Sequence, residues 1–513
     1  MRRLVVAAVL VAAMLGSGPP SIGAPGLAPG LVPGAVASAP ASAGKAGSAG
    51  IGDPYFPRDG NGGYDVRRYS VHDTYRFASR RLSGHTVVRL VASQRLTRFN
   101  LDLLLPVTSV RIDGRAAAFD RPRRHELRIT PRAPIPAGTA VRVKVEYAGY
   151  PDRLAYAGES NWLASSGEVV TMNEPHMAPW WFPANDHPRD KARFDLHLRV
   201  PHGNRVIANG RPDGRTRGPR MTTWHWRAHE PMATYLAFFA AGSFTVETGR
   251  RNGRPWLNAV SNRLSASART ASLSLLRETP RLVHWLEQQL GPYPFDTTGG
   301  VVTSLQPGFA LENQTRPVYP YVGGGAVTLL VHELAHQWYG DDVSVHGWRD
   351  IWLNEGFATF LEVRYRETHG GQAGADWLRS SYDGYGAANS FWAVPVADPG
   401  PGRLFDDPVY YRGAMTLQAL RNVVGESDFW AVMRTWAADH SRHTGSTEQF
   451  RALAEEVSGQ DLAAFFDAWL VSPPSPPTPP RTVSADQEFA DPAEVRPDPA
   501  EVRRSGRSSP IRQ

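Results

Sequence analysis

The fold is decided by residues 327–362, which read VTLLVHELAHQWYGDDVSVHGWRDIWLNEGFATFLE. Apolar residues recur at helical spacing in the first part, so His332 and His336, four residues apart, point the same way from successive turns. Glu355 lies in a second predicted helix, Trp348–Tyr365, and can reach the same point. Two imidazoles and one carboxylate suit a divalent ion such as zinc, and they leave a fourth position open to water. The stretch therefore predicts a catalytic metal site rather than a structural one.

Glu333 lies one position round the first helix, where it can hold a water on the ion without binding the ion itself. Gly340 is expected to end this helix, and His346, in the connecting loop, is expected to be dispensable for metal binding. From the residues alone, the two histidines could instead be polar side chains on a solvated face, because HExxH also occurs by chance. The second helix with a glutamate inside it favours the metal site.

Two segments carry a resemblance to a known family. HELAHQWYGD (332–341) and WLNEGFATFLE (352–362) resemble the aminopeptidase N family of zinc metallopeptidases, which also contains leukotriene-hydrolase and aminopeptidase B enzymes. The resemblance extends from about Tyr64 to Leu470. It implies one zinc ion (Zn2+) per chain. The implied ligands are His332, His336 and Glu355, with Glu333 as the general base.

Length and charge limit the remaining possibilities. The chain has 513 residues, which is enough for two or three domains with sizeable cores. Its formal net charge of +7 is small for this length, and the arginines are scattered rather than gathered into a stripe. This pattern argues against a nucleic-acid partner.

The amino terminus is expected to direct export. Arg2 and Arg3 precede an apolar stretch, Leu4–Leu15, that is too short to span a bilayer, which is typical of a secretory signal. We assign residues 1–39 to the signal and the start of a leader, with the cleavage site open, and residues 40–52 to a flexible leader. Stable membrane insertion is not expected, although a retained anchor is the alternative. The chain has no cysteine, so an exported protein would rest on its core without disulfides.

Residues 53–246 contain short runs of alternating apolar and polar residues separated by turns, for example AVRVKVEY at 140–147. They predict an amino-terminal β domain of antiparallel sheets, a saddle or sandwich, which resembles the amino-terminal domain of the same family. The family match at 174–188 implies that Glu174 reaches into the catalytic cleft. From the residues alone, Glu174 would be a solvated loop carboxylate.

Residues 247–471 are mainly helical, with a predicted helix at Ser265–Leu290 that is interrupted at Pro280. With the family resemblance they indicate a thermolysin-like zinc peptidase domain. The fold class is therefore multidomain α+β. The Pro-rich, charged residues 472–513 are predicted to be a disordered tail.

The segment FALEN, at 309–313, stands where the family usually has Gly-Ala-Met-Glu-Asn on an edge strand. The resemblance implies that Glu312, together with Glu174, pairs with the free α-ammonium of a peptide and so places the first peptide bond at the metal. Ala310 and Asn313 are implied to bind substrate beside it. From the residues alone, Glu312 could be a solvated edge charge that discourages strand pairing.

Residues 409–415, VYYRGAM, match the family pattern of Tyr, any residue, Lys or Arg, then Gly, which selects Tyr410. A phenol there can donate a hydrogen bond to the oxyanion that forms as the carbonyl is attacked. Tyr410 and Tyr411 could also both be packing residues, since aromatics before a helix commonly are.

These features predict a secreted, monomeric zinc aminopeptidase that acts on peptides. A thermolysin-like endopeptidase is one alternative, because it would keep the metal and Glu333 but would not need Glu312. A catalytically silent peptide-binding module is another. Glu333 argues against that module, because a purely structural site has no use for a base.

Overall fold

The computed structural model describes residues 44–386 and 388–471. The expected signal at 1–39 and the expected tail at 472–513 lie outside the described residues. Within the described ranges, no helix has both the length and the apolar character that crossing a bilayer requires.

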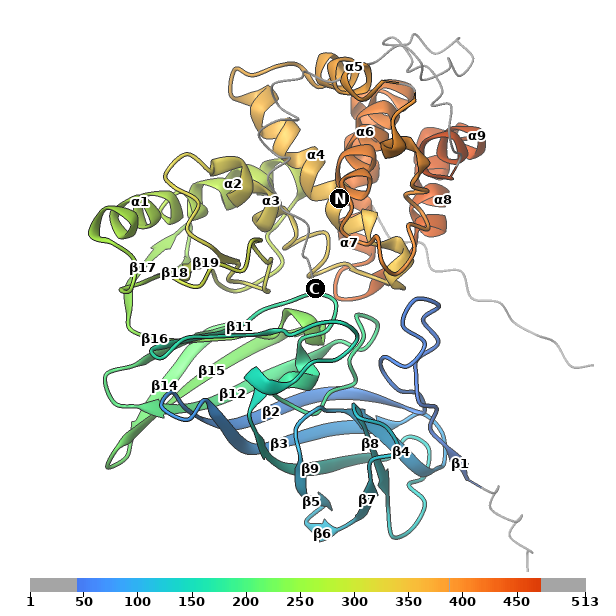
Figure 1. The fold of residues 1–513 in the computed structure, drawn as a ribbon. Coiled ribbons are helices and arrows are strands. Elements are labelled where there is room, and N and C mark those ends of the chain that lie inside the picture. The colour runs from blue at the N-terminus through green and yellow to red at the C-terminus, as the bar shows by residue number, and fades with distance from the viewer. Residues whose placement is uncertain (1–43, 387, 472–513) are drawn as a thin grey trace, which may run out of the picture. The chain divides into compact units, whose positions relative to one another are not determined.

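An eight-stranded sheet is the main element of the amino-terminal β domain (Figure 1). In spatial order its strands are β14 (Arg211–Arg217), β15 (Met221–Met232), β12 (Ala192–Pro201), β2 (Tyr64–Arg76), β3 (Arg81–Ala92), β9 (Ala140–Gly149), β5 (Val107–Ile112) and β6 (Arg115–Ala116). The alternation read from the sequence decides which face of each strand is buried. In β9, for example, Val141, Val143, Val145 and Tyr147 point to the core. In this sheet one pair departs from the antiparallel expectation, because β12 runs parallel to β2.

Two four-stranded sheets complete this domain. One has the order β1 (Lys45–Ala46), β4 (Leu96–Asp102), β8 (Glu126–Thr130) and β7 (Ala118–Asp120). The other has the order β10 (Trp162–Ala164), β11 (Glu168–Thr171), β16 (Phe239–Gly242) and β13 (Arg205–Ala208).

The expectation of a flexible leader at 40–52 is wrong for its described part, 44–52. Here β1 pairs in parallel with β4, and the backbone N–H of Lys45 donates a 2.8 Å hydrogen bond to the carbonyl of Arg95. These bonds are made by the backbone, so a Gly-, Ala- and Ser-rich composition could not reveal them.

The second part of the chain begins with a four-stranded sheet of β17 (Phe244–Arg251), β18 (Arg254–Ser261), β19 (Thr298–Val302) and β20 (Val318–Tyr319). β17 starts shortly before residue 247, and it pairs antiparallel with β18, whereas the other two pairs are parallel. Two helices, α1 (Ala266–Leu276) and α2 (Thr279–Leu290), lie beside this sheet (Figure 1).

The remaining helices are α3 (Val327–Ala335), α4 (Trp352–Thr368), α5 (Gly374–Tyr385), α6 (Asp407–Val424), α7 (Glu426–Asp439), α8 (Thr447–Ser458) and α9 (Ala463–Phe466). A short parallel pair joins β21 (Ser344–Val345) to β22 (Thr444–Gly445). Single turns of 3-10 helix cover Pro151–Arg153, Ala178–Trp180, Thr234–Leu236, Trp348–Asp350 and Ser390–Ala393, and a π turn covers Asp467–Val471.

Three helix boundaries differ from the expectations. The break in Ser265–Leu290 precedes Pro280, because a proline in the first turn of α2 loses no helical hydrogen bond. The helix expected from Trp348 starts with a 3-10 turn, and α4 proper begins at Trp352. α3 ends at Ala335 rather than at Gly340, and His336 caps it with helical backbone angles.

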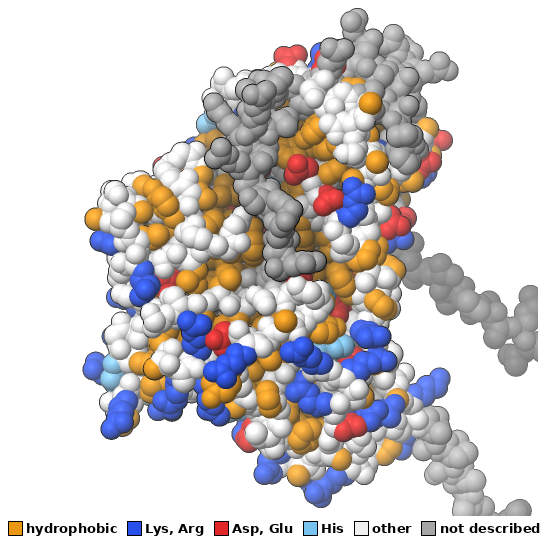
Figure 2. All heavy atoms as spheres, in the orientation of Figure 1, with side chains coloured by type: hydrophobic (Ala, Val, Ile, Leu, Met, Phe, Trp, Pro, Cys, Tyr) orange, Lys and Arg blue, Asp and Glu red, His pale blue; other side chains and the backbone are white. Residues whose placement is uncertain are grey.

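Lysine and arginine side chains on the face drawn in Figure 2 lie mostly over the β sheets. They are interspersed with apolar and uncharged side chains, so the positive charge on this face is dispersed rather than continuous.

Candidate active site

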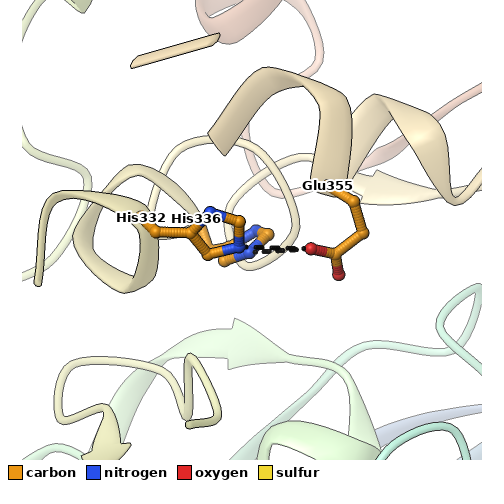
Figure 3. A group of neighbouring side chains, drawn as sticks. All are labelled: His332, His336 and Glu355. Carbon is orange, nitrogen blue, oxygen red and sulfur yellow. Dashed lines mark hydrogen bonds and ion pairs between the residues drawn. The ribbon is translucent and has the colours of Figure 1, made fainter. Parts of the chain in front are cut away.

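The two helices α3 and α4 bring together the three predicted metal ligands (Figure 3). Nε2 of His332 and Nε2 of His336 lie 3.3 Å and 3.4 Å from Oε2 of Glu355, and all three side chains are buried. One ligand atom from each residue lies within 4.8 Å of the other two, which fits a shared ion with bonds of about 2.0–2.2 Å. Two imidazole nitrogens and one carboxylate oxygen are a donor set that suits zinc.

Each histidine is held by a hydrogen bond through its other ring nitrogen. Nδ1 of His332 lies 3.0 Å from Oε1 of Glu362, and Nδ1 of His336 lies 3.0 Å from the backbone oxygen of Tyr339. Such bonds place the proton on Nδ1 and leave the Nε2 lone pair for a metal. The sequence analysis missed Glu362, although it follows Glu355 by two helical turns on the same face of α4.

A close helix crossing brings a third element to this site. Gly356 of α4 meets Gly413 of α6, and a Cβ on Gly356 would lie 2.8 Å from the Cα of Gly413. The crossing places Tyr410, in the first turn of α6, with its ring 6.0 Å from the ring of His332 between centroids. Arg412 of the same motif is buried and donates hydrogen bonds to backbone carbonyls, including that of Trp469 at 2.7 Å. It therefore anchors α6 rather than facing the metal ligands.

Glu333 lies on α3 between the two histidines and is 4% exposed. Its pKa is raised to about 8, mainly by burial and also by the neighbouring carboxylates of Glu312 and Glu355, against the opposing effect of the two histidines. A carboxylate in this environment exchanges a proton near neutral pH, as a general base and acid must.

The carboxylate of Glu312 faces the same site, but it does not come from an edge strand. Its neighbour Leu311 forms an isolated bridge with Val318, and Glu312 itself lies in irregular chain just before the turn at 314–315. Tertiary hydrogen bonds, and not strand pairing, hold this residue in place. Tyr235 donates a 3.1 Å bond to Oε1 of Glu312, and Nε2 of Gln337 donates a 2.8 Å bond to its backbone oxygen.

Glu174 completes the group of carboxylates. It is 8% exposed and Glu312 is 3% exposed, so neither is the solvated charge that the residues alone allowed. Burial raises the pKa of Glu174 well above its usual range, and the carboxylate of Glu312 raises it further. Oε1 of Glu174 has no hydrogen-bond partner among the described residues. Two buried carboxylates close enough for the charge of Glu312 to raise the pKa of Glu174 make a site for a cation.

The other predicted residues have different surroundings. Asn313 is fully buried, and its amide donates a 3.0 Å bond to the backbone of Leu236, which secures the segment that carries Glu312. Ala310 is half-buried. His346 is exposed and lies outside the ligand cluster, and its backbone oxygen accepts a 2.8 Å hydrogen bond from Arg189.

Asp341 is a further carboxylate near the site, and it was not among the residues predicted to form the site. It is fully buried, neither side-chain oxygen has a hydrogen-bond partner among the described residues, and burial followed by Glu312 raises its pKa well above its usual range. Nζ of Lys191 donates 2.7 Å bonds to the backbone oxygens of Asp341 and Asp342. Asp341 follows the predicted ligand His336 by five residues, and this closeness in sequence was the available signal.

Comparison with known proteins extends this picture. The peptidase M1 N-terminal domain matches residues 79–236, and the peptidase family M1 domain matches residues 324–469. Leucine aminopeptidase 2 of Ajellomyces capsulatus is 24% identical over 469 residues, covering 82% of this chain and 73% of that protein. Aminopeptidase N of Lactococcus lactis is 27% identical over 357 residues, covering 64% of this chain and 40% of that protein. The chain spans less than half the length of several such relatives.

Solved structures cover both domains. An M1 zinc metallopeptidase from Deinococcus radiodurans is 26% identical, with a TM-score of 0.74 over 85% of this chain and 100% of that one. A mutant of an M1 zinc metallopeptidase from that organism, bound to a Tyr-Ser-Ala substrate, is 27% identical, with a TM-score of 0.73 over 83% of this chain and 99% of that one. With both characteristic domains in their order, this chain belongs to peptidase family M1.

Proposed function

We propose that the chain is a secreted, monomeric zinc aminopeptidase that removes the first residue of peptides. The observation that carries this proposal is the pair Glu174 and Glu312, which lies buried beside the cluster of His332, His336 and Glu355. That pair is suited to a free α-ammonium group, which only the amino-terminal residue of a peptide provides.

Zinc would be held by the two histidines and Glu355, and when bound it would polarise the scissile carbonyl and lower the pKa of a bound water. Glu333 would take the proton from the attacking water and deliver it to the leaving amine. Its burial and raised pKa support both roles, since the same group must accept and then release a proton.

Tyr410 would donate its phenolic hydrogen to the carbonyl oxygen as negative charge develops there. Its position beside His332 supports this role, and burial followed by the charge of Glu355 keeps its pKa well above 10, so that the proton stays in place.

Glu174 and Glu312 would bind the substrate ammonium and so set the first peptide bond beside Glu333. Desolvated carboxylates are costly until a matching cation arrives, so a blocked amino terminus forfeits most of this interaction. A thermolysin-like endopeptidase would leave this buried pair without a purpose.

The test compares one peptide with a free and with an acetylated amino terminus, and products are identified by mass. The wild type is expected to release single residues from the free peptide only. Glu312→Gln preserves shape and is expected to lower kcat/KM by at least about tenfold, because a charged hydrogen bond contributes roughly 1.5–3 kcal/mol. Glu448→Gln, which removes an exposed carboxylate paired with Arg349, is the matched control. Internal cleavage of both peptides at similar rates would contradict the proposal.

Export through residues 1–39 and the monomeric state are separate parts of the proposal. Amino-terminal sequencing of the protein recovered from culture medium tests the first, and light scattering tests the second. Retention in the cell, or a stable dimer, would contradict the corresponding part.

A further inference from the structure

A second cluster of metal-ligating side chains lies in the amino-terminal β domain. Asp102 ends β4, Glu126 begins β8, and His125 immediately precedes Glu126. One ligand atom from each of the three lies within 4.8 Å of the other two. The residues are 1%, 1% and 3% exposed, so the cluster belongs to the interior and not to a solvated surface.

The two carboxylates of this cluster are placed against each other by the sheet. Asp102 and Glu126 are direct cross-strand partners, so their side chains point to the same face at short range. Burial, and then the charge of Glu126, raises the pKa of Asp102 well above its usual range. Two like charges in such a position are destabilising unless a cation or a proton lies between them.

Among the described residues, three of the four carboxylate oxygens of Asp102 and Glu126 lack a hydrogen-bond partner. Both carboxylate oxygens of Glu126 and Oδ1 of Asp102 are buried and have no hydrogen bond of normal geometry among the described residues. Burial raises the pKa of Glu126, while Arg123, the Asn100 amide and Arg58 lower it only in part. Oε1 of Glu126, one of the oxygens that lack a donor, lies 3.5 Å from Nε2 of His125.

His125 is suited to binding a metal and not to supplying positive charge. Its Nε2 lies 3.5 Å from Oε1 of Glu126 and 3.3 Å from the backbone oxygen of Arg58, a contact that an ion bound to this nitrogen would replace. Burial lowers the pKa of the ring, which favours the neutral imidazole. A neutral imidazole offers a lone pair to a metal ion but cannot balance two carboxylates.

We propose that Asp102, His125 and Glu126 bind a divalent transition-metal ion, in addition to the ion of the active site. Two carboxylates and one imidazole suit Zn2+ or Mn2+, whereas Ca2+ prefers a shell of oxygen ligands alone. The spread of the ligand atoms is compatible with bonds of about 2.0–2.2 Å to one ion.

The site has a structural role because its ligands hold two other segments of the chain. Oδ2 of Asp102 accepts hydrogen bonds from the amide of Asn61 at 3.1 Å and from the backbone of Asp186 at 2.9 Å. Asp186 in turn accepts a 2.6 Å bond from Thr234, whose neighbour Tyr235 contacts Glu312. The metal thus stabilises the loop connections between the β domain and the segment that carries Glu312.

The experiment measures metal content in the full chain carrying His332→Ala and His336→Ala, so that the active site contributes nothing. After exposure to Zn2+, Mn2+ or Ca2+ in turn and removal of free ions, we expect about one equivalent of Zn2+ or Mn2+ per chain. Adding Asp102→Asn and Glu126→Gln should abolish this binding. Asp120→Asn, an exposed carboxylate of the same sheet, should leave it unchanged.

A second measurement covers the case in which the chain carrying Asp102→Asn and Glu126→Gln does not fold. Crystals of the otherwise unmutated chain, soaked with Zn2+, should give anomalous density beside Glu126 as well as beside Glu355. If density is present beside Glu355 but absent beside Glu126, this inference is overturned and the proposed function stays intact. Retention of Ca2+ alone in the variant with His332→Ala and His336→Ala would also overturn it. So would the absence of any metal from that variant, since the carboxylates of Asp102 and Glu126 would then share a proton.

Discussion

The phenol of Tyr235 donates a hydrogen bond of 3.1 Å to Oε1 of Glu312. Tyr235 lies in the 3-10 turn Thr234–Leu236, between two strands of the amino-terminal β domain, whereas Glu312 belongs to the part that carries the metal ligands. The β domain thus takes part in orienting a carboxylate of the substrate site. A domain that contributes none of His332, His336 and Glu355 can therefore orient a carboxylate beside them.

Tyr235→Phe is expected to impair substrate binding without removing the carboxylate. Loss of one hydrogen bond to a buried charged group costs about 1.5–3 kcal/mol, so kcat/KM for a free peptide should fall by about tenfold or more. Steady-state kinetics on a dipeptide amide measure this effect. Tyr321→Phe, at a tyrosine that is 39% exposed, is the control, and equal losses in both variants would contradict the role of Tyr235.

Glu362→Gln is expected to weaken zinc binding by about 10–100-fold, because the carboxylate fixes the Nδ1 proton and the ring orientation of His332. Glu362 also accepts a 3.2 Å bond from Arg366, so Arg366→Gln provides a matched control that leaves the histidine contact in place. Competition with a chelator of known affinity gives both constants. Similar weakening in the two variants would show that general charge near the site, and not the contact with His332, sets the affinity.

The two tyrosines at the start of α6 allow a comparison of neighbouring positions. Tyr410→Phe is expected to lower kcat by about 10²–10³ with little change in KM, because an oxyanion donor acts mainly in the transition state. Tyr411→Phe should stay close to the wild type. Steady-state kinetics of the two variants on one substrate show which tyrosine is the oxyanion donor. The reverse ranking would show that Tyr411 is the donor.

The metal ligands could be predicted because their geometry is local. Two histidines four apart in a helix must lie on one face, and Glu355 needed only a second helix nearby. The architecture of a β domain and a helical domain followed from the change in residue periodicity together with the family resemblance. Glu362 could have been found in the same way as the ligands, from its spacing in α4.

Other features depend on contacts between residues far apart in the chain. The bond from Tyr235 to Glu312 joins positions 77 residues apart, and no periodic pattern reports it. The same holds for the strand Lys45–Ala46, which exists because β4 offers a free edge, and for the irregular segment at Glu312, where an edge strand was expected. The cross-strand pair of Asp102 and Glu126 required the register of β4 and β8, which sequence alone does not fix.

A row of four histidines crosses the eight-stranded sheet. It was absent from the sequence predictions because it depends on the register of four strands. His85, His72, His197 and His225 occupy paired positions on β3, β2, β12 and β15. The ring centroids of neighbouring members lie 4.6, 4.1 and 4.8 Å apart along the row. Two of these pairs are stacked and the pair of His197 and His225 is edge-on, and imidazoles at such distances cannot all carry charge without strong repulsion.

The row predicts a loss of stability in mild acid. Burial, followed by the charges of His197 and His85, lowers the pKa of His72 from 6.5 to about 4, and Lys144 of β9 acts in the same direction. Between these values the unfolded chain binds the proton and the folded chain does not, so the free energy of unfolding falls as the pH falls from about 6.5 towards 4. One such proton contributes at most about 1.4 kcal/mol per pH unit, and less here because the ring is partly exposed.

Urea unfolding of the wild type and of His72→Gln at several pH values in this range should show a shallower decline in the variant. His284→Gln, at a histidine of α2 outside the row, should decline as the wild type does, and parallel curves for all three proteins would refute the role of the row.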